Sequence, residues 1–471
     1  MNEMQEGKGS SSSGVEVRVW AELQQELGPD EIRFDPETLR EYAGDRWHAV
    51  HLPDAVALPR STESVSKILR FASAHRIPVT PRGAGHGYVG GCVPVQGGIV
   101  LSLERMNRVK EIHPEDFVAV VEPGVITGTL QTMAESMGLF YPPDPASRFE
   151  SSIGGNIATN AGGPRCLKYG VTRDYVLGLE VVLADGRVVR LGGRTHKNKT
   201  GFELVRLFVG SEGLLGVITE ATLKLLPRPP FRAAIVAGYD DARAAARAIQ
   251  AVFARGLLPA ALEAADEFTL EAARKYTGSA QLEGCRAMVL TELDGQEESV
   301  RYEMQLLEEA LRVPGMLFLR RGLGHEACEE IWQVRSEFSN ALKATGLKKL
   351  NEDIVVPRGR LVDLFDFAAR LRAEYGIPIA CFGHAGDGNI HTNIMIDESD
   401  PEQVQRGQEI LDRLFRQVIA WGGAITGEHG IGLAKKRWWP WAVSPDVREL
   451  HRQLKEVFDP LGILNPGKFV G

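Results

Sequence analysis

The chain has 471 residues, of which 44% are hydrophobic and 25% charged, and its net charge is −8. This composition is typical of a globular protein, and the length indicates two or three domains. It lacks the long basic clusters of nucleic-acid-binding proteins, and no apolar run approaches the roughly 20 residues that cross a membrane.

The first fifteen residues, 1–15, are polar and rich in serine and glycine, without the apolar core of a signal peptide. We expect a disordered tail on a cytoplasmic protein, and a peripheral association with a membrane stays open. The five cysteines are odd in number and widely spaced, with no C-x-x-C pair. They argue against a disulfide framework, a zinc ribbon and an iron–sulfur cluster.

The predicted elements begin with short amphipathic helices over 16–42 and a strand at 55–59. A helix follows over 64–75, because apolar residues recur there on one helical face. The next strand, 77–80, leads directly into a glycine-rich stretch, 81–91. In α/β proteins, ligand sites usually lie at such a strand end.

This glycine loop, residues 81–91, contains five glycines in eleven residues. Glycine has no Cβ, so backbone N–H groups can approach a ligand and form a nest for an anion such as a pyrophosphate. A Rossmann fingerprint would need a helix to follow, and the Pro- and Gly-containing stretch 92–98 cannot form one. We therefore expect a phosphate site in a different fold, with a plain surface turn as the alternative.

Further strands are expected at 99–102 and 118–121, and a helix over 128–137. The stretch 142–163 is dominated by small residues and side-chain amides, and we interpret it as a loop. Loops of this length are usually functional or disordered, although an irregular connector is the alternative. A small-residue turn follows at 210–216.

A proline cluster at 227–230 marks a domain boundary. Beyond it, short strands alternate with helices, which predicts an α+β domain with one sheet backed by helices.

The stretch 383–393 has the sequence Gly-His-Ala-Gly-Asp-Gly-Asn-Ile-His-Thr-Asn. If Asp-Gly forms a two-residue hairpin turn, His384 pairs with His391, and directly paired Cβ atoms lie about 5 Å apart on one face. Two such imidazoles can share a metal ion at about 2.1 Å. Asn393 then lies on the same face. Two ordinary polar histidines at a sheet edge are the alternative.

A third ligand is available in the glycine-flanked turn 426–432, which contains Glu428 and His429. Histidine and carboxylate together suit zinc or another divalent transition metal, and we expect zinc.

With these motifs in place, the chain resembles the flavin-dependent D-2-hydroxy acid dehydrogenases. This family includes D-lactate dehydrogenases and the flavoprotein subunit of bacterial glycolate oxidase. The resemblance runs from about Arg40 to Lys468, with several motifs in the same order. It implies an α+β fold: a two-subdomain FAD-binding domain of vanillyl-alcohol oxidase type at 16–227 and an α+β cap domain with an antiparallel sheet at 228–420. The segment 421–471 would complete the FAD site.

The resemblance also implies residue roles. His384, His391 and Glu428 match the family's metal ligands, His429 its proposed base, and Arg335 and Asn393 its contacts to the substrate carboxylate. The implied FAD contacts are Pro81, Arg82, Gly83, Ala84, Gly85, His86, Gly87, Gly90, Gly91, Pro143, Asp144, Ser147, Gly154, Gly155, Asn156, Thr159, Asn160, Gly163, Tyr169, Gly170, Glu212, Gly216, Ile218 and Asn465.

Two positions depart from the family pattern. The family usually has Thr or Ser at His86, whereas related berberine-bridge-type oxidases carry a histidine that bonds covalently to the flavin, so covalent attachment through His86 is a hypothesis. The family often has Lys at Asn351 for the substrate carboxylate. Lys349 could substitute, but the missing cation argues against a dicarboxylate substrate.

The expected activity is oxidation of a D-2-hydroxy acid, of D-lactate or glycolate type, to the 2-oxo acid. The metal would assist hydroxyl deprotonation, the flavin would take the hydride, and an external partner protein, quinone or oxygen would accept the electrons. Association into a homodimer is an alternative to a monomer that the sequence leaves open. The runner-up is an FAD oxidase of a sugar or alcohol with His-linked flavin and no metal. A non-catalytic subunit and a zinc hydrolase explain the motifs less well.

Overall fold

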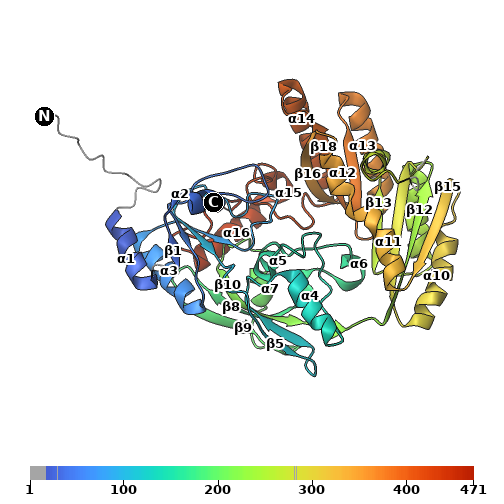
Figure 1. The fold of residues 1–471 in the computed structure, drawn as a ribbon. Helices are drawn as coiled ribbons and strands as arrows, with labels where there is room; N and C mark the ends of the chain where they lie inside the picture. Colours follow the sequence, from blue (N-terminus) through green and yellow to red (C-terminus); the bar gives the residue numbers. More distant parts are fainter. Residues whose placement is uncertain (1–16, 29, 280–281, 283, 471) are drawn as a thin grey trace.

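The computed structural model describes residues 17–28, 30–279, 282 and 284–470 (Figure 1). The tail predicted at 1–15 lies outside the described residues. The chain forms two sheets in its N-terminal half and a larger third sheet after residue 230. Among the described residues, no helix combines the length and the apolarity needed to cross a bilayer.

The first sheet has the strand order β1-β2-β4-β3, and β2, β4 and β3 run parallel. Helices α1 and α3 share one apolar core with it. The Ser61 side chain caps α3, and Arg76 ends that helix in the left-handed conformation. The elements are α1 (Val17–Leu27), β1 (Ile32–Arg33), α2 (Pro36–Glu41), β2 (Ala55–Ala57), α3 (Thr62–His75), β3 (Val79–Arg82) and β4 (Ile99–Ser102).

The second sheet is antiparallel, with the order β5-β6-β10-β8-β9, and α4, α5 and α7 contribute to its core. A separate two-stranded ladder joins β7 to β11. The elements are β5 (Val109–His113), β6 (Val118–Val121), α4 (Thr127–Ser136), β7 (Leu139–Phe140), α5 (Ile153–Thr159), α6 (Cys166–Tyr169), η1 (Thr172–Asp174), β8 (Val176–Val182), β9 (Val188–Gly192), α7 (Val205–Phe208), β10 (Val217–Lys224) and β11 (Leu226–Pro227).

The third sheet has seven antiparallel strands in the order β15-β12-β14-β13-β17-β18-β16. Both faces are covered, since alternate residues of β12 enter two different apolar cores. The strands are β12 (Phe231–Tyr239), β13 (Ala261–Ala265), β14 (Ala287–Gly295), β15 (Met316–Leu323), β16 (Lys348–Val355), β17 (Ile379–His384) and β18 (Asn389–Ile396).

Helices α8, α10, α13 and α14 pack in the core on one face of this sheet, and α9, α11 and α12 in the core on the other. The helices are α8 (Ala242–Ala254), α9 (Glu267–Thr277), α10 (Glu297–Leu311), α11 (His325–Ser336), α12 (Phe338–Lys343), η3 (Arg358–Arg360), α13 (Leu361–Tyr375) and α14 (Pro401–Ala420).

After α14 the chain returns to the N-terminal half through α15 (Trp439–Ala442) and α16 (Pro445–Phe458), drawn in red in Figure 1. Leu464 forms a parallel bridge with Val79 on β3. The Asn465 side chain donates hydrogen bonds to the carbonyls of Gly91 and Glu212, 2.9 and 2.7 Å away. The last part of the chain thus connects the glycine loop with the turn at 210–216.

The antiparallel sheet, the α+β class and most of the expected elements are confirmed, including the helix at 64–75 and the strands at 99–102 and 118–121. The loop interpretation of 142–163 is wrong in its second half. Ser152 caps a true helix there, α5, by accepting a hydrogen bond from the N–H of Gly155. Two glycines in seven residues lower helix propensity, and the cap and the buried Ile153 and Ile157 offset this. The boundary at 227–230 stays a prediction.

Candidate active site

A cavity of about 540 Å³ is lined both by loops of the N-terminal half and by the third sheet with its helices. The glycine loop, the start of α5 and the turn at 210–216 contribute from the N-terminal half. The ends of α11 and α12, with β16 and β17, contribute from the other part. His391, Glu428 and His429 lie in the same wall. The predicted cofactor loops and the predicted reacting groups therefore face one space.

The glycine loop lies against the N-terminus of α5. The Ser152 Oγ accepts hydrogen bonds from the N–H groups of Ala84 and Gly155 at 3.2 and 3.4 Å. A Cβ on Gly83 would lie 2.6 Å from that oxygen, so no other residue fits without displacement. A backbone this bare beside a helix N-terminus can bring N–H groups close to a phosphate.

Most of the residues expected to contact the cofactor line this cavity. Seven lie elsewhere: Gly90, Pro143, Asn160, Gly163, Tyr169, Gly170 and Asn465. The Tyr169 hydroxyl donates a hydrogen bond to Asp294 at 2.8 Å, which connects α6 to the third sheet. The Asn465 side chain donates hydrogen bonds to the glycine loop and to the turn at 210–216. These two residues support the cavity wall.

His384, His391 and Glu428 meet in the wall as expected, with ligand atoms within 4.8 Å of one another. The Glu428 Oε1 lies 3.4 Å from Nε2 of His391 and 3.8 Å from Nε2 of His384. We call these three residues the His-Glu cluster. Its donor set fits a divalent transition metal.

The predicted hairpin register is wrong. His384 pairs with Asn389 and Phe382 with His391, so the connecting loop has four residues. The loop closes because the N–H of Gly388 donates to the His384 carbonyl at 3.1 Å. The observed pairing differs from the predicted one by two residues. Because successive side chains of a strand point to opposite faces, a shift of two leaves both histidines on one face, as diagonal neighbours. The observed register is therefore still compatible with a metal site shared by the two histidines.

Glu263, on β13, was not identified from the sequence. It is fully buried, and its two oxygens lie 2.6 Å from Nδ1 of His384 and from the guanidinium of Arg335. Burial alone would raise the pKa of Glu263, but the charges of His384 and Arg335 bring it down to about 2. The carboxylate holds His384 by Nδ1 and leaves Nε2 facing Glu428.

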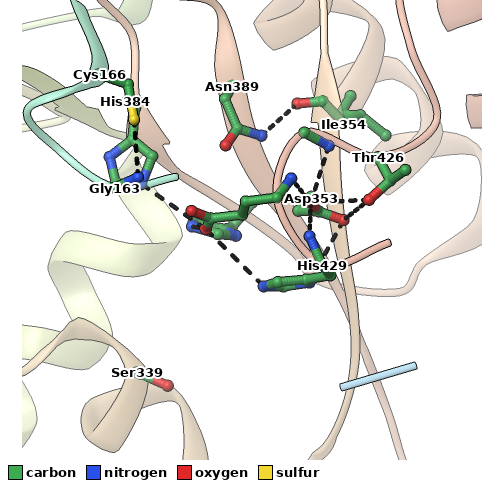
Figure 2. Close-up of polar contacts among 12 residues, drawn as sticks. Gly163, Cys166, Ser339, Asp353, Ile354, His384, Asn389, Thr426 and His429 are labelled. Carbon is green, nitrogen blue, oxygen red and sulfur yellow. Dashed lines mark hydrogen bonds and ion pairs between the residues drawn. The ribbon is translucent and has the colours of Figure 1, made fainter. Parts of the chain in front are cut away.

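Asp353, on β16, was also missed. It is fully buried, and one of its oxygens accepts hydrogen bonds from the N–H groups of Gly427, Glu428 and His429 at 2.7–2.9 Å. The Thr426 hydroxyl donates to the same carboxylate (Figure 2). The buried Lys435 forms an ion pair with it. One carboxylate therefore fixes the turn that carries both Glu428 and His429.

The histidines differ in protonation. Burial lowers the pKa of His391 to about 3, so its imidazole is neutral. Burial also opposes charge on His384, but the carboxylates of Glu263 and Glu428 raise its pKa well above the usual value. His429 stacks on His391 with ring centroids 5.6 Å apart, and its Nδ1 lies 3.4 Å from Asp353.

Arg335 lines the cavity as expected. Asn393 is fully buried behind the wall, where its amide nitrogen donates to the carbonyls of Ala380 and His391. His86 lines the cavity, with Nδ1 3.5 Å from the Glu150 carboxylate. Asn351 and Lys349 both lie in the wall.

Comparison with known proteins agrees with this geometry. Residues 53–192 match the family described as FAD binding domain, and residues 228–469 match FAD linked oxidases, C-terminal domain. The chain is 40% identical to glycolate oxidase subunit GlcD of Bacillus subtilis over 88% of this chain and 89% of that one. It is 33% identical to D-lactate dehydrogenase of Anaerostipes hadrus over 94% and 95%.

The fold is that of 4-ethylphenol oxidase from Gulosibacter chungangensis, with a TM-score of 0.79 at 22% identity, covering 97% of this chain and 98% of that one. The N-terminal part is thus an FAD-binding fold of the vanillyl-alcohol oxidase type. The chain therefore belongs to the family of FAD-linked oxidases that contains these glycolate oxidase subunits and D-lactate dehydrogenases.

Proposed function

We propose that this enzyme oxidises a small D-2-hydroxy acid, of D-lactate or glycolate type, to the 2-oxo acid. The names of its relatives support this substrate class. The observation that carries the proposal is the position of the His-Glu cluster and His429 in the wall of the cavity that the glycine loop lines. Electrons then pass to an external acceptor, a partner protein or a quinone.

FAD fits the N-terminal side of the cavity. The glycine loop and the start of α5 would hold its pyrophosphate, because Gly83 has no side chain and its backbone lies directly against the N-terminus of α5. When bound, FAD supplies the hydride acceptor. The residues at 143–163 and 210–216 would line the rest of the cofactor.

The His-Glu cluster would hold a divalent metal, for which we propose zinc. His391 is neutral and offers a lone pair. Glu263 holds Nδ1 of His384, so that Nε2 would be the ligand after a metal displaced the proton that Glu428 stabilises there. These ligands would place a Lewis acid beside the substrate, which would lower the pKa of the substrate hydroxyl. His429, beside the cluster, accepts the hydroxyl proton. The guanidinium donors of Arg335 that Glu263 leaves free bind the substrate carboxylate.

We also propose that His86 attaches the flavin covalently, since its ring lies in the cavity wall. Acid-denatured protein should then keep its yellow colour after filtration. Complete release of flavin would rule out this attachment without affecting the rest of the proposal. A cytoplasmic location and a homodimer stay predictions from the sequence.

The test is anaerobic bleaching of the flavin absorbance by D-lactate, glycolate, D-2-hydroxyglutarate and longer 2-hydroxy acids, before and after chelation. Bleaching by a D-acid that chelation abolishes supports both substrate class and metal. The alternative, a sugar or alcohol oxidase with His-linked flavin, needs no metal. Bleaching by a sugar or alcohol, unaffected by chelator, would favour it.

The first prediction concerns His391. The variant His391→Ala should lose bound metal and at least about 100-fold in kcat while keeping FAD, because the cluster and the cofactor loops use different residues. Metal analysis, flavin absorbance and turnover on one preparation measure this. His113→Ala, on β5 and absent from the cavity wall, is the control and should keep all three. Full turnover in His391→Ala would refute the metal site.

A further inference from the structure

The wall of the cavity formed by α12 and β16 carries two lysines, Lys343 and Lys349. Lys349 is half-buried, and its ammonium donates a hydrogen bond to the Ser339 Oγ at 3.1 Å. Lys343 is exposed. Both side chains therefore border the space that would hold the substrate.

Two other cations near this part of the cavity are paired with carboxylates. Arg335 is paired with Glu263 at 2.6 Å, and Lys435 is paired with Asp353. Lys348, the neighbour of Lys349 on β16, points to the other face of the strand and pairs with Glu398 at 3.0 Å. Within the described chain, no carboxylate lies within ion-pair distance of Lys349, and Ser339 is its hydrogen-bond partner.

A buried ammonium without a counter-charge costs free energy, and buried charges in proteins are normally paired. Burial and the like charge of Lys343 together lower the pKa of Lys349 to about 8. An anion between the two ammonium groups would remove the repulsion and replace the lost hydration of Lys349. The wall thus has the charge of an anion-binding site.

The position of Lys349 separates this site from the His-Glu cluster. On the ladder between β16 and β18, Asp353 pairs with His391, Asn351 with Asn393, and Lys349 with Met395. Residues 349, 351 and 353 share one face, and four residues of strand span about 13 Å. Lys349 therefore lies at the far end of the site from the groups that would bind the hydroxyl and the first carboxylate.

We propose that the substrate carries a second anionic group, a carboxylate or a phosphate, which binds Lys349 and Lys343 while its 2-hydroxy acid end binds at the His-Glu cluster. This inference rests on the oxidation of a 2-hydroxy acid in the proposed function, and it replaces the D-lactate or glycolate type by a longer acid with two anionic groups. The absence of a lysine at Asn351 argued against a dicarboxylate substrate. This inference reverses that expectation, because Lys349 supplies a cation two residues earlier on the same face of the strand. Lys349 then determines specificity and takes no part in the chemistry.

The test uses substrate pairs of equal length in anaerobic flavin bleaching and steady-state kinetics. D-2-hydroxyadipate is compared with D-2-hydroxyhexanoate, which lacks the second carboxylate, and 3-phospho-D-glycerate with D-glycerate. The holoenzyme should prefer the doubly charged member of at least one pair, by about 10- to 100-fold in kcat/KM, the usual worth of a hydrogen-bonded charge. Which pair shows the preference distinguishes carboxylate from phosphate.

Three variants test whether Lys349 causes the preference for the doubly charged substrate. Lys349→Met should abolish the preference, chiefly by raising KM for the doubly charged acids, and Lys349→Arg should keep part of it. Lys348→Met, the neighbour on the opposite face, should behave as the unaltered enzyme. Methionine fills a similar volume without a charge, so Lys349→Met should fold and retain FAD.

The outcomes separate this inference from the function on which it rests. If singly and doubly charged acids react equally well, or if Lys349→Met slows both equally, the second anion site is wrong while 2-hydroxy acid oxidation stands. If no 2-hydroxy acid bleaches the flavin, the proposed function fails and this inference with it.

Discussion

At the scale of single residues, Asp353 fixes the relative positions of Glu428, which we propose as a metal ligand, and His429, which we propose as the base. These two are adjacent in the chain, and their N–H groups both donate to the same carboxylate oxygen. Asp353 also faces His391 across the β16–β18 ladder. The distance between the side chains of Glu428 and His429 therefore depends on one buried carboxylate.

Asp353→Asn should lower the free energy of unfolding by about 3–5 kcal/mol, because it leaves the ammonium of Lys435 buried with Glu352, 3.4 Å away, as its remaining partner. Adding Lys435→Met should recover much of this stability without recovering kcat. Urea unfolding and turnover measure the two effects. If kcat returned together with stability, Asp353 would have no positioning role beyond folding.

Glu263 makes a comparable contribution to His384. The variant Glu263→Gln should weaken metal binding by about 10- to 100-fold, because it removes the negative charge that orients the imidazole. Glu292→Gln is the matched control: Glu292 is also buried in the third sheet, but it pairs with Arg232 at 2.5 Å. It should reduce stability and leave metal affinity unchanged. Competition with a chelator of known affinity measures both variants, and equal losses would exclude a specific effect of Glu263.

At the scale of elements, the contact between the glycine loop and α5 depends on the space that Gly83 leaves. Gly83→Ala should displace Ser152 and disrupt the helix cap, which costs about 1 kcal/mol, and should lower the FAD content. Flavin absorbance per protein and thermal unfolding measure this. Gly193→Ala is the control, because a Cβ there meets nothing within 4 Å. Normal flavin content in Gly83→Ala would mean that the loop tolerates the displacement.

The sequence predicts elements with strong periodicity, such as α3, and residues that a short motif brings together, such as His384 and His391. It does not predict Glu263, because its contact to His384 joins residues 121 positions apart. A signal existed, since Glu263 is a single carboxylate in an otherwise apolar strand, Ala261–Ala265. Asp353 gave a weaker signal, because three of its partners are backbone N–H groups, which every residue except proline carries.

The hairpin register shows the limit of turn rules. Asp-Gly favours a two-residue turn, but here the hydrogen bonds of β18 to both neighbouring strands, β16 and β17, set the register. Tertiary pairing thus outweighs the local preference.

At the scale of the whole molecule, the C-terminal segment packs against the loops of the N-terminal half. Asn465 has a positive φ of 44°, and its backbone N–H donates to Val79 while its side chain joins the carbonyls of Gly91 and Glu212. Lys468 is fully buried and donates to the Val93 carbonyl at 2.7 Å. The N-terminal loops are therefore completed by residues from the other end of the chain.

Asn465→Gly should keep the backbone conformation and lose both side-chain hydrogen bonds, which leaves two carbonyls without this donor. We expect a loss of about 1–3 kcal/mol in stability and a faster release of flavin on dilution. Leu461→Ser, an exposed position in the same segment, should change stability by less than about 0.5 kcal/mol. If Asn465→Gly released flavin no faster than Leu461→Ser, the link between the two loops would not affect the cofactor.

The same return of the chain sets an order of events during synthesis. The glycine loop emerges early, but its partner Asn465 follows Gly91 by 374 residues. At about 5–20 residues per second, translation needs roughly 20–75 s to cover that distance. A ribosome-bound nascent chain should thus hold FAD weakly or not at all until Asn465 has left the ribosome, so that cofactor loading follows the synthesis of this segment.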